Sequence, residues 1–159
     1  MSKPKGSNPT RAGKRRVVKP VNFNLAQAER MLPLVAHVTE DLQARWGRIA
    51  KLEREQADLD RRRLKLSWPE RARRYDLNDE IALERHGLNS DLAELETLEV
   101  VLVDPGHGEI AFPTIIQGKR AFYVWRVGSE NVNWWCFANE PQRHGIPVAW
   151  RNKKQSLEA

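Results

Sequence analysis

The segment Leu66-Ser67-Trp68-Pro69-Glu70 decides the fold because it interrupts one long helical pattern and restarts another. Ser67 is a candidate helix N-cap and Pro69 suits an early helical position. Glu70, three residues after Ser67, can complete a capping box. The sequence therefore predicts that a first helix ends at Leu66, and that residues 67–70 form the tip of a helical hairpin.

The first helix is predicted upstream of this tip, beginning after Asn24. Asn24 is a candidate N-cap, and Gln27 can reach back toward it from three residues later. Apolar or small side chains then recur in steps of three and four residues, the spacing that holds one stripe of a helix against a partner helix. They are Leu25, Ala28, Leu32, Val35, Thr39, Leu42, Trp46 and Ile49, followed after polar residues by Leu52, Leu59 and Leu66.

A second helix with a similar stripe is predicted after the tip. Neither stripe is wide enough to stabilise an isolated helix in water, so the two helices should pack antiparallel against each other. We therefore expect a long, coiled-coil-like two-helix hairpin over residues 22–98. The stripe of the second helix contains Tyr75, Leu77, Ile81, Glu84, Leu88, Leu92, Leu95 and Leu98.

Residues 99–150 change to short β-branched and aromatic runs separated by turn residues, which is typical of strands. Asp104-Pro105-Gly106-His107-Gly108 has proline and glycine where β-turns favour them. We expect a small antiparallel sheet of about four strands, one face of which covers the base of the helices. The fold class is therefore predicted to be α+β, with strands at 100–103, 109–112, 121–127 and 132–138.

Positive charge is concentrated at the start of the chain. The 159 residues carry a net charge of +6, yet residues 1–20 hold seven lysines and arginines and no acid, so the other 139 residues sum to −1. This tail is rich in proline and glycine and poor in apolar surface, and we predict it to be disordered. It could neutralise phosphates, or serve only to keep the chain in solution. Residues 151–159 are predicted to be a polar C-terminal tail.

Basic residues also gather on both sides of the predicted tip. Solvation of a helix end is the simpler interpretation of such a charge run. The presence of Trp68 and Tyr75 among the arginines favours a second interpretation, since aromatic and guanidinium groups together can stack on bases and bind phosphates. The candidate residues for polyanion contact are Lys14, Arg15, Arg16, Arg61, Arg62, Arg63, Trp68, Arg71, Arg73 and Arg74.

The sequence contains no motif for catalysis or for cofactor binding. It lacks a Walker loop, a GxGxxG fingerprint, an HExxH pair and a CxxC pair. A turn role or a core role explains each residue that could otherwise converge on a site, and the single Cys136 excludes an internal disulfide. We predict no catalytic residue, no metal site and no cofactor. The residues considered are Asp104, His107, Glu109, Cys136 and His144.

Composition disfavours a membrane-spanning or exported protein. Charged residues make up 30% of the chain and the mean hydropathy is −0.67. No run approaches the roughly 20 apolar residues of a membrane helix, and the basic start lacks the apolar stretch of a signal peptide. We therefore expect a cytoplasmic protein that makes no membrane contact.

Three stretches resemble patterns of one family. Residues 23–35, Phe-Asn-Leu-Ala-Gln-Ala-Glu-Arg-Met-Leu-Pro-Leu-Val, resemble F-T-x-x-E-A-x-x-L-L-P-L-V. Residues 103–113 resemble K-D-x-x-x-G-L-V-D-F-P, and residues 118–128 resemble G-R-x-V-Y-L-C-W-R-L-G. Over residues 22–150 the chain thus resembles an uncharacterised bacterial family catalogued as domain of unknown function 2203.

The resemblance has implications for architecture and for one group of side chains. Relatives carry an acid, a second acid and a histidine where this chain has Ala111, Ser129 and Cys136. If those groups form a site in relatives, the resemblance implies that this chain has lost it. The family has no assigned activity, so the resemblance bears on fold more than on function.

Three functions are compatible with these features. We favour a non-enzymatic interaction protein that contacts RNA, DNA or another polyanion through its tail and tip. The alternative is a protein-binding or self-associating scaffold that uses the exposed part of the helical stripe. The third is an enzyme at the junction of helices and sheet, which requires Asp104, His107 and His144 within hydrogen-bond reach of one pocket.

Overall fold

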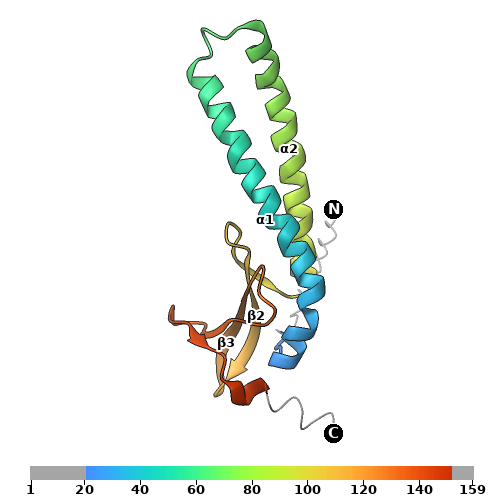
Figure 1. Cartoon of the computed structure of the whole chain (residues 1–159), viewed down its shortest axis with the longest axis vertical. Helices are drawn as coiled ribbons and strands as arrows, with labels where there is room; N and C mark the ends of the chain where they lie inside the picture. Colours follow the sequence, from blue (N-terminus) through green and yellow to red (C-terminus); the bar gives the residue numbers. More distant parts are fainter. Residues whose placement is uncertain (1–20, 152–159) are drawn as a thin grey trace, which may run out of the picture.

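The fold of the computed structural model is α+β, and the structure describes residues 21–151. Two long helices, α1 (Leu25–Arg61) and α2 (Trp68–Thr97), form a hairpin, and an antiparallel sheet follows them in the chain. Figure 1 shows the hairpin extending away from the sheet as a rod, with the turn between the helices at its far end. The N-terminal tail, with its candidates Lys14, Arg15 and Arg16, lies outside the described residues, as do residues 152–159.

Both helices begin at the predicted capping boxes. The backbone N–H of Gln27 donates to Asn24 Oδ1 at 2.8 Å, and Gln27 Oε1 accepts from the Asn24 backbone at 2.9 Å. Ser67 and Glu70 form the same reciprocal pair at the start of α2. Each box satisfies backbone N–H groups that a helix start leaves without intrahelical partners, which fixes where the helix begins.

The first helix ends earlier than predicted. α1 stops at Arg61 rather than at Leu66, and the chain turns back over the next residues. Leu66 is buried against Leu59 and Leu77, with Leu77 fully buried. Continuing the helix would carry Leu66 onward along the α1 axis, whereas the turn brings its side chain into this small cluster. Burial of the leucines therefore accounts for the early end of α1.

Two predicted stripe residues face solvent. Tyr75 is 76% exposed and Trp46 is 45% exposed. Tyr75 lies only two residues before the buried Leu77, and a step of two residues turns about 200° around a helix, so both cannot face the partner. The predicted stripe residues that are buried are Leu25, Ala28, Leu32, Val35, Thr39, Leu42, Ile49, Leu59 and Leu66 before the tip and Leu77, Ile81 and Leu95 after it.

The sheet has five antiparallel strands in chain order, one more than the predicted four. The additional strand contains only two residues, too few to give a sequence pattern. A single helical turn at residues 148–151 follows it. The strands are β1 (Val101–Asp104), β2 (Glu109–Ile116), β3 (Lys119–Arg126), β4 (Trp134–Phe137) and β5 (His144–Gly145).

Alternation along the strands gives the sheet two different faces. The inner face, which includes Phe112 and Trp125, is buried in the main core with residues of α1. At this junction the rings of Phe23 and Phe112 meet edge to face, with centroids 5.4 Å apart. The Phe23 backbone N–H also donates to the Pro113 carbonyl at 2.8 Å. The start of α1 is thus fastened to β2, while the small leucine cluster near the tip stabilises the other end of the hairpin.

Candidate functional site

The hairpin tip presents a strongly basic surface. Residues 61–75 contain seven lysines and arginines and one acid, Glu70, which gives a formal charge of +6. All seven basic side chains except the half-buried Arg73 are exposed. The structure therefore places six of the predicted contact residues, Arg61, Arg62, Arg63, Arg71, Arg73 and Arg74, around the end of one rod.

Four of these arginines are engaged in ion pairs within the hairpin. Arg73 and Arg74, both on α2, pair across to Glu55 and Asp60 of α1, each at 2.7 Å. The hydrogen bond from Arg73 is the main reason that the pKa of Glu55 is lowered. These two pairs join α1 to α2 near the tip. The remaining pairs are Arg61 with Asp58, Arg62 with Asp58 and Glu70, and Arg73 with Glu80.

Three basic side chains at the tip have no such partner. Within residues 21–151, the side chains of Arg63, Lys65 and Arg71 form no hydrogen bond or ion pair. Arg63 and Arg71 line a hollow of about 300 Å³, whose other walls are Leu66, Arg74, Tyr75 and Asn78. Trp68 is 78% exposed nearby at the start of α2. The tip thus combines unneutralised cations with exposed aromatic rings.

The predicted contact residues do not include Lys65, Tyr75 or Asn78, although the Tyr75 ring among the arginines is one reason to predict this surface. A signal for the last two was present, because Arg71, Tyr75 and Asn78 are four and then three residues apart, and this spacing places them on one helix face. The contribution of Arg63 to the same hollow could not be found in this way. It comes from the turn, whose course depends on the packing of Leu66.

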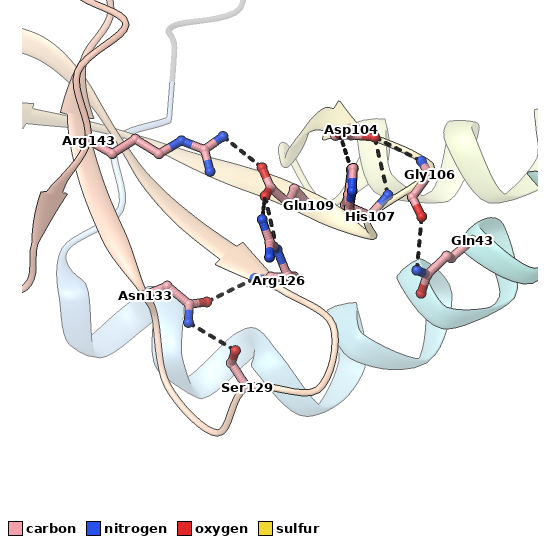
Figure 2. A network of polar contacts seen from close by, with 9 residues as sticks. All are labelled: Gln43, Asp104, Gly106, His107, Glu109, Arg126, Ser129, Asn133 and Arg143. Carbon is pink, nitrogen blue, oxygen red and sulfur yellow. Dashed lines mark hydrogen bonds and ion pairs between the residues drawn. The ribbon is translucent and has the colours of Figure 1, made fainter.

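A second polar cluster lies on the outer face of the sheet (Figure 2). The Glu109 side chain is only 4% exposed, and it accepts hydrogen bonds from Arg143 at 2.7 Å and from Arg126 Nε at 3.0 Å. Both guanidinium groups also lie over the Trp134 ring, at 5.3 and 5.4 Å from its centroid. The hydrogen bonds, that of Arg143 first, hold the pKa of Glu109 below its usual value although burial acts in the opposite direction.

The residues of the proposed enzyme site are only partly brought together. His107 Nδ1 lies 2.6 Å from Asp104 Oδ2, and hydrogen bonds from His107 lower the pKa of Asp104. Gln43 donates to the Gly106 carbonyl at 3.1 Å and thereby holds this turn on α1, as Figure 2 shows. His144 instead stacks on Trp135 of the inner face, with ring centroids 4.4 Å apart. Asp104 and His144 thus lie on β1 and β5, the opposite edge strands of the sheet, and no hydrogen bond or ring contact within residues 21–151 joins His144 to Asp104 or His107.

The three positions that the resemblance assigns to a possible site in relatives, Ala111, Ser129 and Cys136, do not form a polar cluster in this structure. Ala111 is buried, and Cys136 is half-buried, with a pKa that burial raises, so the thiol is not activated. Ser129, in the β3–β4 connection, accepts a hydrogen bond from Asn133 at 2.9 Å. No group of three or more histidine, cysteine or acidic side chains placed to hold a metal ion is found over residues 21–151.

Replacing Glu109 with glutamine is expected to lower the free energy of unfolding by about 1–2 kcal/mol at neutral pH, because the ion pairs with Arg126 and Arg143 are lost while both arginines remain partly solvated. Folding lowers the pKa of Glu109, so its contribution is complete above the ordinary value of 4.5 and is lost as the pH falls through the folded-state value. Urea unfolding across this range should show the gap between wild type and variant closing in acid.

The exposed Glu130 provides the control for this comparison. Glu130→Gln should leave the free energy of unfolding nearly unchanged at every pH. A gap between wild type and the Glu109 variant that stays constant or widens in acid would contradict the stabilising role of the Glu109 carboxylate.

Within the described part of the chain, neither helix combines the length and apolar character that crossing a bilayer requires.

Comparison with known proteins identifies a family. Neither the curated proteins nor the solved structures contain a significant match. The sequence profile of a family described as "Uncharacterized conserved protein (DUF2203)" matches residues 22–144. This match spans more than half of the 159 residues, and the chain therefore belongs to the DUF2203 family of uncharacterized conserved proteins.

Proposed function

We propose that this chain is a non-enzymatic interaction protein that contacts RNA, DNA or another polyanion through its basic tail and its hairpin tip. The observation that carries the proposal is the set of three partnerless cations, Arg63, Lys65 and Arg71, at the exposed end of the rod. A row of phosphates binds such groups favourably, since each lysine or arginine that contacts a backbone phosphate releases a condensed counterion.

The ion-paired arginines support the same proposal in a different way. The pairs of Arg62 and Arg74 lie at the surface, where an ion pair contributes little net stability. A dense row of phosphates can therefore compete with Glu70 and Asp60 for these side chains. The seven charges of residues 1–20 would add sequence-independent affinity to the same ligand.

The salt dependence of binding tests this proposal. If the seven tail charges and the three tip cations all meet phosphates of single-stranded RNA, log K should fall with log salt with a slope of about −7. Deleting residues 1–20 should leave a slope of about −2, and Arg63→Gln, Lys65→Gln and Arg71→Gln together should leave about −5. Fluorescence anisotropy with a labelled oligonucleotide, from about 50 to 200 mM salt, measures each slope.

A matched triple variant controls for total charge. Lys51→Gln, Arg54→Gln and Arg120→Gln remove three exposed cations outside the tip and should leave the slope near that of wild type. A flat salt response of the wild type would overturn the proposal, as would equal slopes for the tip variant and the control. A chain that bound no polyanion and scattered light as a dimer would support the scaffold alternative instead.

A further inference from the structure

The hollow at the tip has the composition of a nucleotide-binding surface. Its lining comes from the turn through Arg63 and from one face of α2 through Arg71, Arg74, Tyr75 and Asn78. Its volume, about 300 Å³, is at the lower end of the range for small-ligand sites. Guanidinium groups, a phenol ring and an amide thus border one concave surface. A ligand that combines phosphate with a flat heteroaromatic ring would use all three kinds of group.

The charges of the hollow are not cancelled from within. Arg74 is bound to Asp60 at 2.7 Å, but Arg63 and Arg71 have no partner among the described residues. The hollow therefore carries two free positive charges on its wall. Guanidinium groups bind phosphate oxygens with two parallel hydrogen bonds, which fixes the position of the phosphate as well as attracting it.

The uncharged groups of the hollow are available as well. The Tyr75 side chain is 76% exposed and has no hydrogen bond or ring contact within residues 21–151, so its face is open. Asn78 Oδ1 accepts from Gln56 at 2.5 Å, and this bond directs the amide while its Nδ2 group keeps both donors unused in the described structure. A ligand ring could stack on Tyr75, and a hydrogen-bond acceptor at the edge of the ligand ring could accept from Asn78 Nδ2.

We propose that the ligand of this hollow is single-stranded nucleic acid, with one base stacked on Tyr75, its edge toward Asn78, and flanking phosphates on Arg63 and Arg71. The inference rests on the proposed function and names the class of polyanion. Bases in a duplex are paired and stacked on one another, so their faces are closed to Tyr75. A polyanion without bases would leave the Tyr75 ring and the Asn78 Nδ2 group without a partner.

A lipid surface is the competing ligand, because Leu64 and Trp68 are also exposed near the tip. Insertion into a bilayer would use these two apolar side chains, and it gives no role to the Asn78 amide. The hollow lies instead on one side of the hairpin end, where Arg71, Tyr75 and Asn78 are held together by α2. The observations therefore favour a nucleic acid strand.

The test compares two polymers that differ only in their bases. Full-length chain is titrated with a labelled oligouridylate of about 12 nucleotides, within the usual site size of single-strand binders, and with an abasic phosphodiester of equal length. Wild type should bind the oligouridylate about tenfold more tightly than the abasic polymer, since stacking of one base contributes on this scale. Tyr75→Leu should abolish this difference without changing affinity for the abasic polymer.

Two further variants locate the effect. Trp46→Leu removes a half-exposed aromatic ring outside the hollow and should leave both affinities unchanged. The double variant Arg63→Gln, Arg71→Gln should bind both polymers more weakly by the same factor. The loss of two phosphate contacts lowers the affinity about 25-fold at 0.1 M salt. The circular dichroism spectrum of each variant should match that of wild type. A lower affinity is then an effect on binding and not on folding.

The possible failures are distinguishable. Equal, salt-dependent affinities of wild type for the two polymers would overturn this inference and leave the proposed function standing. An affinity difference that Trp68→Leu removes and Tyr75→Leu does not would also overturn it, because the base would then lie outside the hollow. No binding to either polymer, with binding to mixed phosphatidylserine and phosphatidylcholine vesicles that Leu64→Ser abolishes, would overturn it in favour of a membrane surface.

Discussion

Replacing Phe112 with alanine is expected to lower the free energy of unfolding by about 3–5 kcal/mol. Phe112 is fully buried in the middle of β2, on the face that packs against α1, and its ring meets Phe23 edge to face. The variant loses this ring contact and leaves a cavity at the point where the hairpin is fastened to the sheet. Urea unfolding monitored by circular dichroism measures the loss.

Phe122 provides a matched control on the opposite face of the same sheet. It is half-buried. Its partner on the adjacent strand β2 is Pro113, which points to the opposite face from Phe112 because side chains alternate along a strand. Phe122→Ala should cost less than half as much as Phe112→Ala, because less apolar surface is lost from the interior. Equal losses for the two variants would mean that the outer face of the sheet is as well packed as the inner one, contrary to the arrangement described.

Local features of the fold could be predicted because the groups involved are close in sequence. Asn24 with Gln27, and Ser67 with Glu70, form capping boxes within four residues, so their residue types and spacing are sufficient. The end of α1 could not be predicted in the same way. It depends on contacts of Leu66 with Leu77, which follow only once α2 has packed against α1.

The candidate site shows the same division between local and long-range information. The sequence indicated a basic tip, but which of its cations remain without partners depends on how the two helices are aligned. Arg73 reaches Glu55, 18 positions earlier in the chain, only because α1 and α2 lie in one particular register. Glu109 likewise looks like a strand residue beside a turn, and its burial depends on Arg143, 34 positions later. The number of charged residues in a segment does not predict such pairs between distant residues.

Replacing Leu77 with alanine is expected to lower stability by about 2–5 kcal/mol. The loss of stability should be confined to the end of the hairpin, which should unfold locally more often. Leu77 is fully buried in a cluster with Leu59 and Leu66 that is separate from the main core. The other contacts near the tip are largely surface ion pairs, which stabilise little by themselves. Hydrogen exchange should show faster exchange of backbone amides near the tip and unchanged protection in β2 and β3.

Leu83 on the same helix provides the control, since its side chain is 70% exposed. Leu83→Ala should leave exchange near the tip as in wild type. Uniformly faster exchange over the whole Leu77→Ala chain would show that the hairpin and the sheet unfold together, and would contradict the separation of the two clusters.

The same Leu77 variant also separates charge from geometry in ligand binding. Its lysines and arginines are all retained, so the salt dependence of oligonucleotide binding should remain close to that of wild type. Recognition of the base should disappear, because Arg63 on the turn and Tyr75 on α2 keep their relative positions only while Leu66 and Leu77 are packed together. We expect the variant to bind oligouridylate and the abasic polymer equally. A preserved preference for oligouridylate, alongside demonstrated local unfolding, would show that base recognition does not depend on the folded hollow.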